Sequence, residues 1–258
     1  MTPVQDVETL RGRTAPIEMS AAEFRDAGYQ LVNRIADWLE QMPGGPVVRQ
    51  DSAEGVRRAL DAARGLPDAG TDAGTLLDEA TQLLFQHSLF NGHPRFFGYI
   101  TSSPAPIGAL GDLLASAINA NVGAWRLSPM ATEIELQTIR WIAELIGFPR
   151  DAGGLLVSGG NMANFVCFLA ARAAKAEHVR SGGIRAGAQL RVYASSETHT
   201  WIQKAADLFG LGTDSIRWIP ADAEQWLETA ALERQLVADR SSGDVPMLVV
   251  GTAGTVST

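Results

Sequence analysis

The chain has 258 residues, of which 46% are hydrophobic and 19% charged, and its formal net charge is −8 at pH 7. This composition allows a sizeable buried core and excludes wholesale disorder, while the acidic balance argues against non-specific binding to nucleic acid or to anionic membranes. The only cysteine, Cys167, falls in an apolar helical pattern where we expect a buried, unreactive thiol. The first residues show no signal segment, which favours a cytoplasmic protein.

Helical patterns occupy most of the first 90 residues. Ser20 and Glu23 form a capping-box pattern at the start of an amphipathic helix that Pro43 ends. Two more helices are expected, over about 52–64 and 75–90. The apolar stripe of the first helix needs a surface to pack on, which is either this chain's own domain or a second subunit.

Turns and two further helices follow. Asn-Gly and His-Pro pairs mark turns within 91–99, and the aromatic residues there give that segment strand character. Residues 106–121 are apolar and small, so we expect a buried helix. Ser128-Pro129 is a strong helix start, and that helix should end near Gly147.

The stretch from 153 to 200 has the pattern of a ligand site. An apolar strand is expected at 155–157, followed by Ser158-Gly159-Gly160-Asn161 and then by a helical run. Glycine lets the backbone turn sharply and approach a ligand closely, and the free N–H groups of a helix start favour a phosphate. An ordinary strand-to-helix turn has the same local pattern, so the site depends on what lies beside it.

A second strand, 192–194, carries Ser195, Ser196 and His199 to its C-terminal end, where ligands bind in open α/β sheets. Two more strands are expected at 216–219 and 247–251, with helices at 200–209 and 223–239. This alternation predicts an α/β fold with a mostly parallel sheet covered by helices.

Five motifs occur in order along the chain. They are H-P-R-F-F-G-Y (93–99), S-P-M-A-T-E-I-E (128–135), S-G-G-N-M-A-N (158–164), A-S-S-E-T-H-T (194–200) and G-T-A-G-T-V-S-T (251–258). Together they resemble the group II pyridoxal-phosphate-dependent amino-acid decarboxylases, the family of aromatic-amino-acid and glutamate decarboxylases. The resemblance implies fold type I, the aspartate aminotransferase-like fold. It further implies that 1–90 form a helical segment exchanged between the subunits of a homodimer, and that 91–258 form the first part of the large cofactor-binding domain.

The resemblance also implies pyridoxal 5'-phosphate as cofactor and decarboxylation of an aromatic or related L-amino acid. The backbone N–H groups of Gly159, Gly160 and Asn161 would bind the phosphate, with the Thr255 hydroxyl nearby. His199 would stack on the pyridine ring, although a satisfied polar core histidine is the plainer alternative.

Tyr99, Ile100 and Thr101 match the loop that lines the substrate side of the cofactor in the family. Gly123 stands where bulkier apolar residues are common in members with aromatic substrates, which leaves the substrate class open. The motifs imply neither a metal nor a nucleic-acid or membrane partner.

Two parts of the family's site have no counterpart, namely the aspartate on the pyridine nitrogen and the Schiff-base lysine. The two lysines, Lys175 and Lys204, match neither. We therefore expect the N-terminal part of a longer enzyme, with the C-terminal part missing. Three classes of function stay open: a decarboxylase, an oxidative aldehyde synthase or aminotransferase-like enzyme with the same cofactor, and a catalytically inactive fragment that acts as a dimerisation or regulatory partner.

Overall fold

The computed structural model describes residues 11–13, 15, 17–49, 51–184 and 187–255. The chain divides into two compact units, Met1–Leu110 and Gly111–Thr258. This division falls inside helix α5, Pro106–Ile118, whereas the domain boundary at 90/91 and the exchange of the first segment between subunits stay predictions. Among the described residues, no helix is long and apolar enough to cross a membrane.

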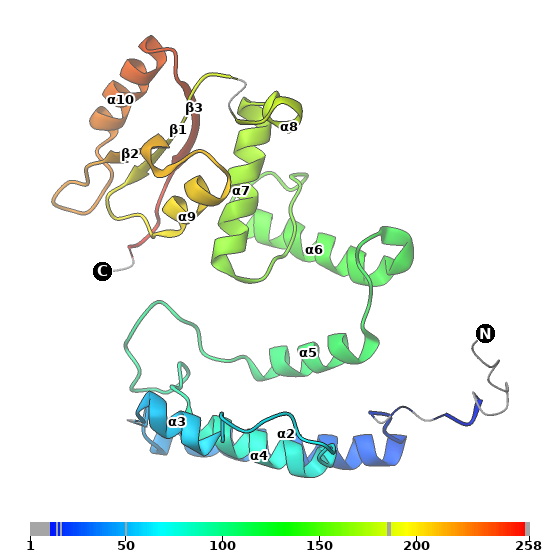
Figure 1. Ribbon diagram of the computed structural model, residues 1–258. Coiled ribbons are helices and arrows are strands. Elements are labelled where there is room, and N and C mark those ends of the chain that lie inside the picture. Colours follow the sequence, from blue (N-terminus) through cyan, green and yellow to red (C-terminus); the bar gives the residue numbers. More distant parts are fainter. Residues whose placement is uncertain (1–10, 14, 16, 50, 185–186, 256–258) are drawn as a thin grey trace. The chain divides into compact units, whose positions relative to one another are not determined.

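The first unit is helical (Figure 1). Besides the start of α5, its described elements are α2 (Ala21–Gln41), the 3-10 turn η1 (Met42–Gly44), α3 (Ala53–Ala59) and α4 (Ala73–His87). The predicted capping box is present, because Ser20 Oγ accepts a hydrogen bond from Glu23 N (3.2 Å) and the Glu23 carboxylate accepts one from Ser20 N (2.8 Å). Helices α2 and α4 pack together, with Trp38 of α2 stacked on Phe85 of α4 at a ring-centroid distance of 4.8 Å.

The second unit is an α/β structure. Its described elements are the rest of α5, η2 (Trp125–Leu127), α6 (Pro129–Leu145), α7 (Gly159–Lys175), α8 (Val179–Gly182), β1 (Leu190–Ser195), α9 (Trp201–Leu208), η4 (Thr213–Ser215), β2 (Ile216–Ile219), α10 (Thr229–Ser241) and β3 (Val245–Val250). In the described part of the chain the three strands form one sheet in the order β2-β1-β3, and both pairings are parallel (Figure 1). The predicted parallel α/β arrangement is therefore confirmed.

Strand β1 is the centre of the sheet, and its side chains alternate between two different environments. Leu190, Val192 and Ala194 are buried in the hydrophobic core, together with residues of α7 and α9 such as Phe168 and Ile202. This alternation follows from the two-residue period of a strand. The opposite face of β1 carries Arg191, Tyr193 and Ser195.

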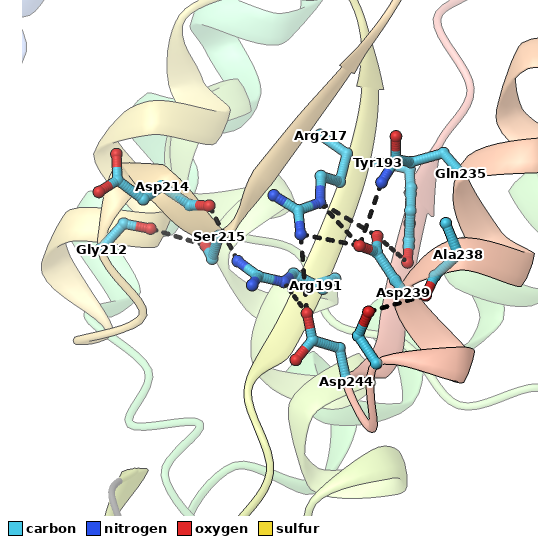
Figure 2. A network of polar contacts seen from close by, with 11 residues as sticks. Arg191, Tyr193, Gly212, Asp214, Ser215, Arg217, Gln235, Ala238, Asp239 and Asp244 are labelled. Atoms are coloured by element: carbon cyan, nitrogen blue, oxygen red, sulfur yellow. Dashed lines mark hydrogen bonds and ion pairs between the residues drawn. The ribbon is translucent and has the colours of Figure 1, made fainter.

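That opposite face holds a polar network beneath α10 (Figure 2). Asp239, only 3% exposed, accepts hydrogen bonds from the Arg217 guanidinium (2.7 and 3.1 Å), the Tyr193 hydroxyl (2.9 Å) and the Gln235 amide (3.1 Å). Arg191 Nε pairs with Asp244 at 2.6 Å. The hydrogen bond from Arg217 is the main cause that holds the pKa of Asp239 below its usual value. Burial, then the hydrogen bond to Asp239, raises the pKa of Tyr193 above its ordinary value. Asp239 is therefore ionised at neutral pH, whereas the Tyr193 hydroxyl keeps its proton and donates it to Asp239.

One predicted strand is wrong. Residues 155–157 are irregular, with Leu155 and Leu156 each 55% exposed. The Leu156 N–H donates to the Glu135 carboxylate (2.8 Å) instead of to a neighbouring strand. Residues 91–99 contain the predicted turns but have no strand, and Phe97 is exposed.

Two predictions of burial and one helix start are also wrong. No residue of α5 is buried, although its sequence is apolar. Cys167 is exposed, because its neighbour Phe168 takes the inward position on α7. Helix α10 starts at Thr229 instead of near residue 223, since Asp222 Oδ1 accepts the N–H groups of residues 224 and 226 and so holds a turn there.

Candidate functional site

A pocket of about 640 Å³ lies in the second unit, where α7 and α9 begin. It is lined by Ser158, Gly159, Gly160, Asn161, Asn164, His199 and Trp201. The structure thus brings together, on one pocket, the glycine turn before α7 and the histidine that follows β1.

The start of α7 is shaped for a ligand that approaches the backbone. Gly159 has φ +81°, in the region that glycine adopts without strain. A Cβ atom at Gly159 or Gly160 would meet nothing within 4 Å, so both glycines face open space. Ser158 makes no side-chain hydrogen bond that would cap α7, and the same holds for α6, α9 and α10. The first N–H groups of α7 and the positive end of its dipole therefore favour an anion.

The loop after β1 is held by hydrogen bonds that place His199. Ser195, the last residue of β1, accepts the Glu197 N–H at Oγ (3.1 Å) and the Thr198 N–H at its carbonyl oxygen (2.9 Å). The hydroxyls of Thr198 and Thr252 are 3.1 Å apart, which joins this loop to the segment after β3. His199 follows, with an exposed ring whose Nδ1 accepts the Trp201 N–H at 3.2 Å. The exposed ring argues against a histidine buried in a polar core.

Thr255 does not line the pocket that holds His199. It is buried after β3 and lines a second pocket of about 400 Å³, together with Ser195 and Glu197. The structure therefore does not bring Thr255 onto the pocket that His199 lines, and a role for its hydroxyl near the phosphate stays a prediction.

The three residues expected on the substrate side belong to the first unit. Tyr99, Ile100 and Thr101 are exposed there, and Tyr99 is 87% exposed with φ +60°. Left-handed backbone at a non-glycine residue is uncommon and occurs often in functional loops. Their contact with a substrate stays a prediction.

Two lining residues, Asn164 and Trp201, were not singled out from the sequence. Asn164 lies four residues after Gly160 and therefore on the same face of α7. Trp201 lies two residues after His199, at the first position of α9. Once Gly160 and His199 were assigned to the pocket, these spacings could have identified Asn164 and Trp201 as further lining residues.

Comparison with known proteins gives a consistent result. The family model described as "Pyridoxal-dependent decarboxylase conserved domain" matches residues 55–258. The chain is 32% identical over 241 residues to the aromatic-L-amino-acid decarboxylase of Bacillus atrophaeus, covering 93% of this chain and 48% of that protein. It is 27% identical over 248 residues to the phenylacetaldehyde synthase of Arabidopsis thaliana, covering 93% of this chain and 49% of that protein.

The fold agrees with these matches. The crystal structure of Oryza sativa TDC with PLP and tryptamine superposes with a TM-score of 0.84 at 28% identity, covering 95% of this chain and 51% of that one. The chain therefore spans about half the length of the relatives that it matches.

Proposed function

Because the chain belongs to the pyridoxal-dependent decarboxylase family, we propose that it serves the pyridoxal-phosphate-dependent decarboxylation of an aromatic or related L-amino acid to the amine and CO₂. The observation that carries this proposal is the pocket that the start of α7 shares with His199. It offers backbone donors for a phosphate and an imidazole for an aromatic ring.

The residues present fit pyridoxal phosphate by their chemistry. The N–H groups of Gly159, Gly160 and Asn161 would bind the phosphate, which the open space at both glycines and the absence of a Ser158 cap support. The exposed His199 ring would cover the pyridine ring and hold it flat. When bound, pyridoxal phosphate supplies an electron sink for the pair released as CO₂ departs.

Neither lysine of the chain lines this pocket. Lys175 is the last residue of α7 and Lys204 lies within α9. The described residues thus place no lysine amine in the pocket that could hold the cofactor covalently. Binding of the cofactor by this chain would therefore be non-covalent, and it is measured separately from turnover.

Two measurements test the proposal. Titration with pyridoxal 5'-phosphate, followed by its visible absorption, reports binding by the chain, and release of labelled CO₂ from a panel of aromatic, acidic and diamino L-amino acids reports the reaction. The CO₂ assay is also run on a completed protein, in which this chain is joined to the second half of one of the longer relatives that it matches. We expect saturable binding by this chain and CO₂ release by the completed protein. A completed protein that binds the cofactor but releases no CO₂ from any amino acid would refute the decarboxylase assignment.

An oxidative aldehyde synthase is the second candidate, and the 27% identity to phenylacetaldehyde synthase favours it. The two reactions differ in their products. The decarboxylase gives one amine per CO₂ without consuming O₂, whereas the synthase consumes O₂ and gives an aldehyde. An oxygen electrode combined with product chromatography separates them.

We further propose a homodimer located in the cytoplasm. Apolar side chains that α5 exposes, including Ile107, Leu114 and Ile118, support a subunit interface. A single cysteine, which cannot form a disulfide within the chain, is consistent with a reducing compartment. Light scattering coupled to size-exclusion chromatography tests the first proposal, and cell fractionation tests the second.

A further inference from the structure

The hydrogen bond at His199 determines where its ring carries a proton. Nδ1 lies 3.2 Å from the backbone nitrogen of Trp201. A backbone N–H can only donate, so Nδ1 must accept, and an accepting ring nitrogen holds no proton. In the neutral ring the proton is then on Nε2.

The Trp201 N–H is held firmly in place. Trp201 is the first residue of α9, and its indole is buried in the hydrophobic core together with Ile202 and Ala205. Rotation of this N–H away from the imidazole would require the start of α9 to leave the core. Trp201 therefore acts through His199, as a positioning residue.

The same kind of hydrogen bond occurs a second time among the described residues, at His93. There Nδ1 accepts the N–H of Arg95, also two residues further on, at 3.0 Å. Nε2 of His93 lies 3.1 Å from the Gly45 carbonyl oxygen, which can only accept, so Nε2 carries the proton. His93 is 2% exposed, and its N–H is used inside the protein. At His199 the described residues offer Nε2 no hydrogen-bond partner, and the ring lines the pocket.

We propose that His199 is held as the neutral Nε2–H tautomer and that it presents this N–H to the pocket as a hydrogen-bond donor for an oxygen atom of the bound ligand. This inference rests on the proposed function. The ring face stays available for stacking while the ring edge donates. In this state Nε2 cannot accept a proton, so His199 orients an acceptor and does not act as a base.

Nuclear magnetic resonance reads the tautomer directly and without any ligand. In a protein labelled with ¹⁵N at histidine, long-range ¹H–¹⁵N correlations are recorded at about pH 8.5, two units above the ordinary histidine pKa of about 6.5. We expect the Nε2–H pattern for His199 and for His93. His87 is an internal contrast, because its Nδ1 lies 2.7 Å from the Asp51 carboxylate and must donate there. Spectra of the His199→Gln and His93→Gln variants assign the signals. An Nδ1–H pattern or an averaged pattern at His199 would overturn the proposal.

Addition of pyridoxal 5'-phosphate tests the donor role. We expect the Nε2 signal of His199 to shift on binding and that of His93 to stay in place. A His199 signal that does not move while the cofactor binds overturns the ligand-facing donor.

A pair of variants gives a second measurement. The oxygen of His199→Asn can still accept the Trp201 N–H but puts no donor at the Nε2 position, whereas the amide of His199→Gln reaches that position. Both variants lose the stacking ring, so we expect the Asn variant to bind pyridoxal 5'-phosphate roughly three- to tenfold more weakly than the Gln variant, as for one hydrogen bond. Equal affinities would contradict the donor role. Failure of the unaltered chain to bind the cofactor would refute the proposed function, whereas the tautomer is measured independently of it.

Discussion

Replacement of Asp239 by Asn perturbs the polar network beneath α10 with almost no change in side-chain volume. The carboxylate accepts hydrogen bonds from Arg217, Tyr193 and Gln235. An amide offers one oxygen and places an NH₂ group against these donors, so at least one donor loses its acceptor. Arg217 loses its nearest counter-charge and keeps only Asp244, whose Oδ2 lies 3.6 Å from its guanidinium. Hydrogen bonds to charged groups contribute about 1.5–3 kcal/mol each, and breaking a buried ion pair costs about 3–5 kcal/mol.

The expected cost of Asp239→Asn lies below that upper range. The Arg217 side chain is 29% exposed and Asp244 stays 3.6 Å from it, so water and a second carboxylate partly compensate the guanidinium once its pairing with Asp239 is lost. We therefore expect a loss of about 2–3 kcal/mol in the free energy of unfolding. Urea unfolding followed by tryptophan fluorescence and circular dichroism measures it. Asp214→Asn is the matched control, because Asp214 is exposed and contributes only its carbonyl oxygen to Arg191.

A double-mutant cycle identifies the cause. If the lost pairing with Arg217 is the reason, Asp239→Asn should cost at least about 1 kcal/mol less in an Arg217→Met background, since the two residues are in direct contact. A loss below about 0.5 kcal/mol at Asp239, or equal losses in both backgrounds, would refute the reasoning.

The other predictions concern pH, the pocket and the first unit. The pKa of Asp239 is lowered in the folded state, so its contribution to the free energy of unfolding is present above the unfolded pKa of about 3.9 and is lost as the pH falls through the folded value. The urea midpoints of the unaltered and Asp239→Asn chains should therefore converge in acid. A gap between the midpoints that does not change with pH would contradict this. His199→Ala should abolish turnover of the completed enzyme with only a modest loss of cofactor affinity, measured by CO₂ release and absorbance titration, whereas near-normal turnover would exclude the ring-stacking role. Gly159→Ala, at φ +81°, should cost about 1–2 kcal/mol of unfolding free energy, and Gly160→Ala, where no left-handed backbone is required, should cost clearly less in the same urea assay. Ser20→Ala removes the cap of α2 and should cost about 1 kcal/mol by urea unfolding monitored in the helical circular-dichroism signal; no change would mean that α2 does not depend on its cap.

Local chemistry made much of the fold predictable. The capping box at Ser20 and Glu23 formed as expected because both of its partners lie within four residues. The predicted strand 216–219 coincides with β2, because an apolar run after a turn has few alternatives. Family motifs led to the glycine turn and His199, which the structure places on one pocket.

The failures concern properties that depend on distant neighbours. Residues 155–157 have a strand-like sequence, but in the described sheet no strand pairs with them, and their backbone is held by Glu135 instead. Helix α5 is apolar, yet burial requires a partner surface, which its own sequence cannot specify. At Cys167 a one-residue error in phase turned the side chain by about 100° around α7, and Phe168 occupies the inward position.

The two unlike faces of β1 also determine how precisely the site is placed. A register shift of one residue along β1 would place Arg191 and Tyr193 in the hydrophobic core and Val192 on the polar face, beside carboxylate and guanidinium groups. Such a register shift would therefore cost much free energy, and the position at which the chain leaves the end of β1 is fixed. The position of His199, four residues after Ser195, depends on where β1 ends. The charged groups of the network beneath α10 contact no ligand, yet they help to position the ring that would bind the cofactor.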